Sequence, residues 1–231
     1  MKTILFIDTE TIGLPEKDPL NNSAFYPPEM YDKYDKARMI ELACALYELN
    51  EHTGSMFHIK SVSSIIVPNG FTIENESVHG ITTEQAMKYG KPLPDILKIL
   101  YYDFLNQANE VIGHNVSFDM NILLSECYRM SHDSRNNAPF QGTRNRVRSL
   151  NIKYEELIEK LQIIPTKCTM KMGRKVLNLS KYPKLTELYS MFNKNQCTHQ
   201  NHRAMEDIQW TSVCYMGIRN MIQRYKDRIP L

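Results

Sequence analysis

The chain has 231 residues, 42% of them hydrophobic and 23% charged, with a formal net charge of +2. This length and composition predict one globular domain, 1–231, with a substantial core. The small net charge excludes a protein whose whole surface attracts nucleic acid, so any phosphate contact must come from a local patch.

The cysteines indicate a reducing environment. The chain has 5 of them, scattered and without a Cys-x-x-Cys pair, which favours free intracellular thiols over a disulfide framework. Asp8 interrupts the apolar N-terminal run, which therefore does not resemble a signal peptide. No segment reaches the length of a membrane span. We expect an intracellular protein without a membrane partner.

The first predicted strand, 2–8, ends in two carboxylates. Side chains alternate along a strand, so Asp8 and Glu10 point to the same side. Like charges at close range disfavour each other unless a cation lies between them, and hard oxygen ligands suit Mg2+ or Mn2+. The alternative is a polar strand end that faces solvent. Gly13 follows, where the backbone can turn sharply.

Residues 14–37 are rich in proline and tyrosine and predict a loop insertion with a short helix at 28–36. Its tyrosines could stack on bases, or they could pin a surface loop by packing. Two strands, 39–49 and 58–67, form a hairpin. Helices follow from Thr82, a capping residue, and over 94–108, where apolar residues have helical spacing.

A short strand, 110–113, precedes the turn 114–119. Ser117 can cap a helix that runs to about Arg129 and carries Asp119 in its first turn. An acidic residue there could act in a site or could simply favour the helix dipole.

Residues 131–186 predict a polar and basic insertion that contains a helix at 150–161. The stretch 165–186 has no acidic residue and is either a solvated face or a phosphate contact; its basic residues are Lys167, Lys171, Arg174, Lys175, Lys181 and Lys184. Helices follow at 183–192 and 202–224, and His202 and Asp207 lie near the start of the second. The order of elements predicts an α/β fold, a mixed central sheet flanked by helices.

Four motifs then appear in a familiar order. They are Asp8–Leu14 (Asp-Thr-Glu-Thr-Ile-Gly-Leu), His79–Ile81 (His-Gly-Ile), His114–Asp119 (His-Asn-x-x-Phe-Asp) and His202–Asp207, with a related segment at Cys168–Met170. In these motifs, over most of its length, the chain resembles the DnaQ-like DEDDh 3′–5′ exonucleases. The resemblance implies the ribonuclease H-like fold.

The resemblance also implies roles for the motif residues. Asp8, Glu10 and Asp207 would bind one divalent ion, and Asp8 would bridge to a second ion near Asp119. His202 would act as general base on the attacking water. The chemistry agrees, because two ions, Mg2+ or Mn2+, held by carboxylates assist phosphodiester hydrolysis, and imidazole can take a proton near neutral pH.

The implied substrate is the 3′ end of single-stranded nucleic acid, with DNA favoured. Substrate contacts are expected from eight residues: Thr9, Thr11, Ile12, Gly13, Leu14, His79, Asn115 and Phe118. The family commonly has a second threonine where Ile12 stands, a departure that leaves the metal ligands unchanged.

Three alternatives stay open. An exoribonuclease that trims RNA would share these motifs. A non-catalytic nucleic-acid-binding protein could use the same fold. Cys197, His199 and His202 could hold zinc, although a fourth ligand would have to be remote. The chain ends soon after its last helix, so a stand-alone enzyme is expected and no polymerase partner is evident. Monomers and homodimers both fit.

Overall fold

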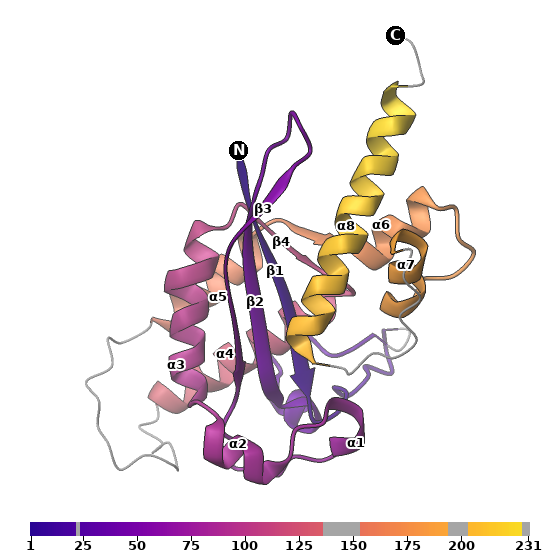
Figure 1. The fold of residues 1–231 in the computed structure, drawn as a ribbon. Coiled ribbons are helices and arrows are strands. Elements are labelled where there is room, and N and C mark those ends of the chain that lie inside the picture. Colours follow the sequence, from indigo (N-terminus) through magenta and orange to yellow (C-terminus); the bar gives the residue numbers. More distant parts are fainter. Residues whose placement is uncertain (22–23, 136–152, 194–202, 228–231) are drawn as a thin grey trace.

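The computed structural model describes residues 1–21, 24–135, 153–193 and 203–227. Its centre is a five-stranded sheet in the order β3-β2-β1-β4-β5 (Figure 1). The strands are β1 (Lys2–Thr11), β2 (Met39–Leu49), β3 (Met56–Ile65), β4 (Glu110–Gly113) and β5 (Thr166–Cys168). β2 pairs antiparallel with β1 and β3, whereas β4 runs parallel to β1 and β5. The carboxyl ends of β1, β4 and β5 therefore share one edge of the sheet.

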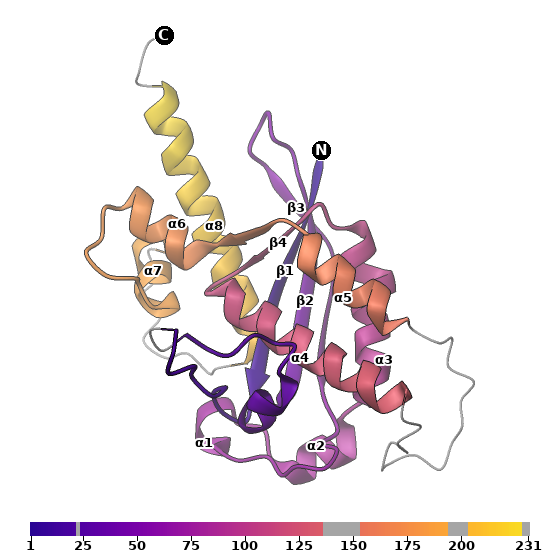
Figure 2. The same ribbon diagram turned by 180° about the vertical axis from the view of Figure 1, so that it is seen from behind.

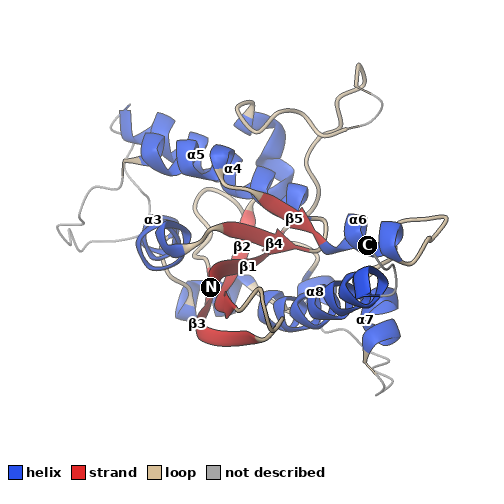
Figure 3. Cartoon of the chain, turned by 90° about the horizontal axis from the view of Figure 1, so that it is seen from above, coloured by secondary structure: helices blue, strands red, loops and turns tan. Residues whose placement is uncertain are grey.

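β1 is covered on both faces, as its continuous apolar run predicts. Leu5 and Ile7 belong to a large core with the helices on one side, whereas Ile4 and Phe6 pack in a second core on the other side. Figure 3 shows the sheet between these two helical layers. Alternation along β1 thus decides which helical layer each of its side chains faces.

The layer facing Leu5 and Ile7 contains α3 (Leu93–Lys98), α4 (Val116–Arg135) and α5 (Tyr154–Ile163). The opposite layer contains α6 (Thr169–Val176), α7 (Leu185–Phe192) and α8 (Ala204–Asp227). In this second layer Tyr189 of α7 stacks on Trp210 of α8, with ring centroids 4.6 Å apart. Packing between α7 and α8 fixes the layer that covers Ile4 and Phe6.

Several predicted helices have different limits. The segment 94–108 is not one α-helix, because α3 continues into the π-helical η2 (Ile99–Phe104) and the 3-10 helix η3 (Leu105–Gln107). The expected helix at 28–36 is the 3-10 helix η1 (Tyr31–Ala37). The helix start at Thr82 is confirmed, since its side chain accepts from the Gln85 amide and caps α2 (Thr83–Tyr89). A short α1 (Glu76–His79) precedes it.

The segment 131–186 contributes elements to the sheet and to both helical layers. It contains the end of α4, then α5 and α6, and β5 joins the central sheet beside β4. β5 has only 3 residues, too few to show a strand pattern in the sequence. Residues 136–152 of this segment lie outside the described part.

Residues 14–21 and 24–37 lie on the side of the molecule that carries α4, as Figure 2 shows from behind. Tyr34 is buried and donates to the Tyr26 carbonyl at 2.7 Å, and Arg129 of α4 donates to the Tyr31 carbonyl at 2.6 Å. These contacts support the interpretation that aromatic packing pins the loop. No helix in the described ranges is long and apolar enough to cross a membrane.

Candidate active site

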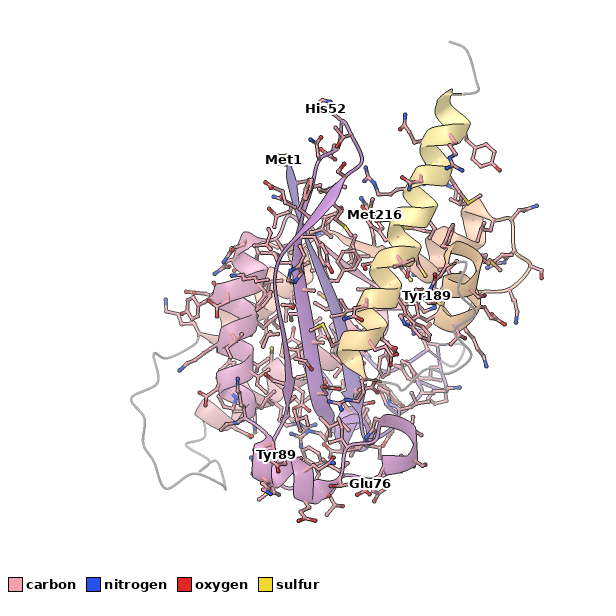
Figure 4. All side chains as sticks on the ribbon, viewed as in Figure 1. Met1, His52, Glu76, Tyr89, Tyr189 and Met216 are labelled. Atoms are coloured by element: carbon pink, nitrogen blue, oxygen red, sulfur yellow. The ribbon has the colours of Figure 1, made fainter. Side chains whose placement is uncertain are left out.

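Three carboxylates meet at the carboxyl end of β1. Asp8 and Glu10 follow Ile4 and Phe6 at every second position, so they face the α8 layer. Asp207 lies in the first turn of α8, whose Ala204 and Ile208 pack against that same core. Ligand oxygens of the three residues all lie within 4.8 Å of one another. In Figure 4 this edge is the one near Glu76, and the hairpin tip at His52 marks the opposite edge.

Asp8 and Glu10 are poorly neutralised by the described residues around them. The pKa of Glu10 is raised to about 8, first by burial and then by the charges of Asp207 and Glu41, while Arg203 acts in the opposite direction. The pKa of Asp8 also lies well above its usual range, first through burial and then through Asp119, Asp207 and Glu10. Close, partly buried carboxylates with raised pKa values form a site that a divalent cation would stabilise. Asp8, Glu10 and Asp207 therefore fit such an ion.

Asp119 lies beside this group and is fastened to β1. It is buried in the first turn of α4, and its Oδ1 accepts the Thr9 amide at 3.0 Å and the Thr9 hydroxyl at 2.8 Å. Burial raises its pKa to about 7, although the two Thr9 hydrogen bonds act in the opposite direction. The two hydrogen bonds from Thr9 thus hold Asp119 against β1, the strand that carries Asp8.

His202 lies outside the described residues. α8 begins at Ala204, so His202 precedes the helix in sequence. The alternative zinc ligands Cys197 and His199 lie outside the described residues too. Both hypotheses for His202 therefore stay predictions.

The turn after β1 is tightly built. The Thr11 hydroxyl donates to the Gly13 carbonyl at 2.7 Å, and the Ile12 carbonyl accepts from Asn75 at 2.7 Å. A Cβ on Gly13 would lie only 2.7 Å from the Lys36 carbonyl oxygen, which explains a glycine here. Leu14 projects outward and is 64% exposed. The turn therefore presents main chain and one apolar side chain beside the carboxylates.

The remaining expected substrate contacts differ in access. Asn115 is exposed and adopts the left-handed conformation, with φ 67°. Phe118 is half-buried and packs edge-on against Phe25. Thr9 is buried and committed to Asp119. These positions favour Asn115 over Thr9 as a side chain that can meet a ligand.

His79 has a structural position. It is buried, its Nε2 lies 2.9 Å from the Glu74 carbonyl, and its Nδ1 accepts the Ile81 amide at 3.1 Å. Both ring nitrogens are therefore used within the segment that contains α1. The geometry gives His79 the role of shaping that segment, and direct contact with a substrate is not supported.

Sequence reasoning missed Glu41 and Arg203. Glu41 on β2 pairs in register with Glu10 and is 1% exposed. Its carboxylate accepts from Arg203 Nη2 at 2.8 Å, Arg203 Nε at 3.1 Å and the Ala204 amide at 3.3 Å. This bidentate pair anchors the start of α8, one turn from Asp207. The available signal was the one carboxylate within the apolar run 39–46, because a buried carboxylate requires a partner.

His114 links the Asp119 turn to the α6–α7 layer. Its Nε2 donates to the Pro183 carbonyl at 3.1 Å, and its Nδ1 lies 3.0 Å from the Thr169 hydroxyl. Burial lowers its pKa to about 4, so the ring is neutral at physiological pH. His114 therefore serves as a rigid connection between two parts of the site edge.

Comparisons with known proteins agree with this geometry. A family model described as exonuclease, RNase T, matches residues 5–213. A moderately thermophilic exonuclease I from Methylocaldum szegediense has a similar structure, with TM-score 0.59 and 17% identity over 95% of this chain and 41% of its own. The cell-death related nuclease 4 (CRN-4) gives TM-score 0.54 and 12% identity over 96% of this chain and 64% of its own. No curated protein sequence matches significantly.

At these identities the two structures establish a shared fold, and this chain spans less than two thirds of either. The family model covers most of the chain and includes Asp8, Glu10, Asp119 and Asp207. The chain belongs to the RNase T exonuclease family, within the DnaQ-like group of the ribonuclease H-like superfamily.

Proposed function

We propose that this protein is a DEDDh-type 3′–5′ exonuclease that hydrolyses single-stranded DNA from its 3′ end. The observation that carries the proposal is the meeting of Asp8, Glu10 and Asp207 within 4.8 Å at one sheet edge. Because burial and neighbouring carboxylates raise the pKa values of Asp8 and Glu10, the cluster suits a cation better than it suits a structural role.

Asp8, Glu10 and Asp207 would hold one Mg2+ or Mn2+, and Asp8 with Asp119 would hold a second. When bound between carboxylates, two such ions generate a nucleophile at neutral pH and relieve charge on the leaving oxygen. Thr9 keeps Asp119 in place through its two hydrogen bonds. His202 would take the proton of the attacking water, a task that an imidazole performs near neutral pH.

The substrate end would lie over the turn after β1. Thr11, Ile12 and Gly13 present main chain there, and the exposed Leu14 offers an apolar surface to a base. Asn115 and Phe118 border the same edge. The four cysteines in the described ranges, Cys44, Cys127, Cys168 and Cys214, are buried and free. This pattern supports an intracellular protein.

A gel assay on 5′-labelled single-stranded DNA and matching RNA tests the proposal, with Mg2+, Mn2+ or EDTA. We expect a metal-dependent ladder that shortens from the 3′ end, faster on DNA. Asp8→Ala should lower the rate roughly a thousandfold, since the ions contribute several kcal/mol. Glu110→Gln, which changes a buried carboxylate at the opposite edge, is the matched control. Full activity in Asp8→Ala, or no degradation of either polymer with either metal, would overturn the proposal.

His202→Ala should lose most of the rate and keep Mn2+ binding, because a general base is no metal ligand. Single-turnover rates and calorimetric Mn2+ titrations measure the two effects. A collapse of metal affinity in this variant would count against the general base and in favour of a metal site at His202.

A further inference from the structure

One face of α6 carries three basic side chains, Lys171, Arg174 and Lys175, here called the α6 strip. Their spacing of three and four residues places them on the same side of the helix. All three are exposed. The opposite side of α6 is buried, and a Cβ on Gly173 would lie 2.8 Å from Leu188 of α7. The packing of α6 therefore presents the α6 strip to solvent.

The charges of the α6 strip are not neutralised by neighbours. None of its three residues forms an ion pair with another residue in the described ranges, whereas nearby Lys167 pairs with Glu110 at 2.9 Å and Lys181 with Glu187 at 2.7 Å. The sequence from 165 to 186 contains no acidic residue. A local positive potential of this kind attracts phosphate groups although the whole chain has a small net charge.

The α6 strip starts at the edge that carries the three carboxylates. β5 runs parallel to β4, which runs parallel to β1, so α6 leaves the sheet at the edge where Asp8 lies. His114 fixes this arrangement through Thr169 and the Pro183 carbonyl. Figure 1 shows α6 and α7 beside α8, leading away from the sheet. A strand whose end lies among the carboxylates can therefore continue over α6.

An aromatic ring completes this surface. The guanidinium of Arg174 lies 4.6 Å from the ring centroid of Tyr182, and Tyr182 is 48% exposed. An exposed tyrosine beside cations is typical of surfaces that bind single strands, because a base can stack on the ring while its phosphates meet the cations. The pair adds a base contact to the phosphate contacts.

We propose that the α6 strip and Tyr182 bind the part of a single-stranded nucleic acid that lies upstream of its 3′ end. The strip holds phosphates and Tyr182 stacks on a base. This inference rests on the proposed function, because it uses the carboxylate cluster as the place of the 3′ end. It explains how a chain of small net charge can hold a polyanion.

The test is a triple variant, Lys171→Gln/Arg174→Gln/Lys175→Gln, made in the inactive Asp8→Ala protein. Fluorescence anisotropy measures its binding to a single strand of about 12 nucleotides across a range of salt concentrations. The affinity falls with rising salt, and each lost phosphate contact makes the slope of log affinity against log salt less steep by about 0.7. The slope should therefore become less steep by roughly 2, and the affinity should fall roughly tenfold.

The control variant is Lys60→Gln/Lys98→Gln/Lys160→Gln, which removes the same charge from β3, α3 and α5. Its binding should match that of the parent. Tyr182→Leu should lower affinity roughly tenfold with an unchanged salt slope, since stacking releases no counterions. If the strip variant keeps the slope and affinity of the control variant, the inference is wrong.

The active forms separate this inference from the proposed function. A wild-type protein that degrades strands while the strip variant behaves as the control variant overturns the role of the α6 strip and leaves the exonuclease intact. A wild-type protein that degrades nothing, but whose binding depends on the α6 strip, supports the binding surface and overturns the exonuclease.

Discussion

Buried carboxylates at the two edges of the sheet have different neighbours, and their pKa values shift in opposite directions. At one edge Glu110 of β4 is 1% exposed, and it contacts Lys2 at 2.8 Å and Lys167 at 2.9 Å. Burial alone would raise its pKa, but the two ammonium groups outweigh burial and lower it. At the other edge burial and the neighbouring carboxylates raise the pKa of Glu10 to about 8.

This contrast distinguishes a structural charge from a functional one. Glu110 has cationic partners supplied by the fold, so it needs nothing further. Asp8 and Glu10 lie close to Asp207 and have raised pKa values, an arrangement that destabilises the metal-free fold and that an added ion would relieve. Glu41 is intermediate: it lies at the functional edge, yet Arg203 neutralises it.

The largest effect on stability is expected from Arg203→Met. This change leaves Glu41 buried without its partner, next to Glu10, and should cost about 3 kcal/mol in the free energy of unfolding. The rate should also fall, because the start of α8 positions Asp207. Urea unfolding and single-turnover rates measure the two effects.

The double variant Glu41→Gln/Arg203→Met removes both charges and should recover most of that stability. An Arg203→Met protein as stable as wild type would show that the pair does not anchor α8.

A smaller effect concerns pH in the metal-free protein. The folded pKa of Glu10, about 8, lies above its ordinary value of 4.5, so the folded state holds this proton more tightly than the unfolded chain. The contribution of protonated Glu10 to the free energy of unfolding is therefore fully present below about pH 4.5, and it is lost as the pH rises towards 8. The melting temperature in EDTA should fall between pH 5 and pH 8, and Glu10→Gln should reduce that fall. An equal fall in the variant would contradict the raised pKa of Glu10.

The smallest effect on stability is expected at Glu110, at the edge of the sheet opposite the three carboxylates. Glu110→Gln removes one charge but can keep hydrogen bonds to its neighbours, and should cost about 1 kcal/mol in the free energy of unfolding. Its nuclease rate and Mn2+ affinity should equal those of wild type. A large loss of either would show that the two edges are coupled.

Strand alternation allowed part of the site to be predicted. It placed Asp8 and Glu10 on one side of β1, and the motif order brought Asp207 to the same edge. Strand alternation did not identify the hydrogen bond from Thr9 to Asp119, because this contact joins residues 110 positions apart in the sequence. Local patterns carry no information on such a distance.

Other structural features could not be predicted from sequence patterns. β5 is too short for periodicity, and η2 has apolar spacing that also suits an α-helix. The His79–Ile81 motif suggested a substrate contact for His79, yet burial and two hydrogen bonds favour a structural role. The partner of Glu41 lies 162 residues away, so only the fold shows that the two meet.

The most direct test of the account is calorimetric titration of Mn2+ into the metal-free protein at pH 7, in two buffers of different ionisation enthalpy. We predict that wild type and Glu110→Gln bind Mn2+ and release protons, because Glu10 and Asp119, with pKa values of about 8 and about 7, are partly protonated before the ion arrives. Asp8→Asn should bind much more weakly. Absence of binding in wild type, or equal binding in Asp8→Asn, would contradict the claim that these carboxylates form a metal-dependent active site.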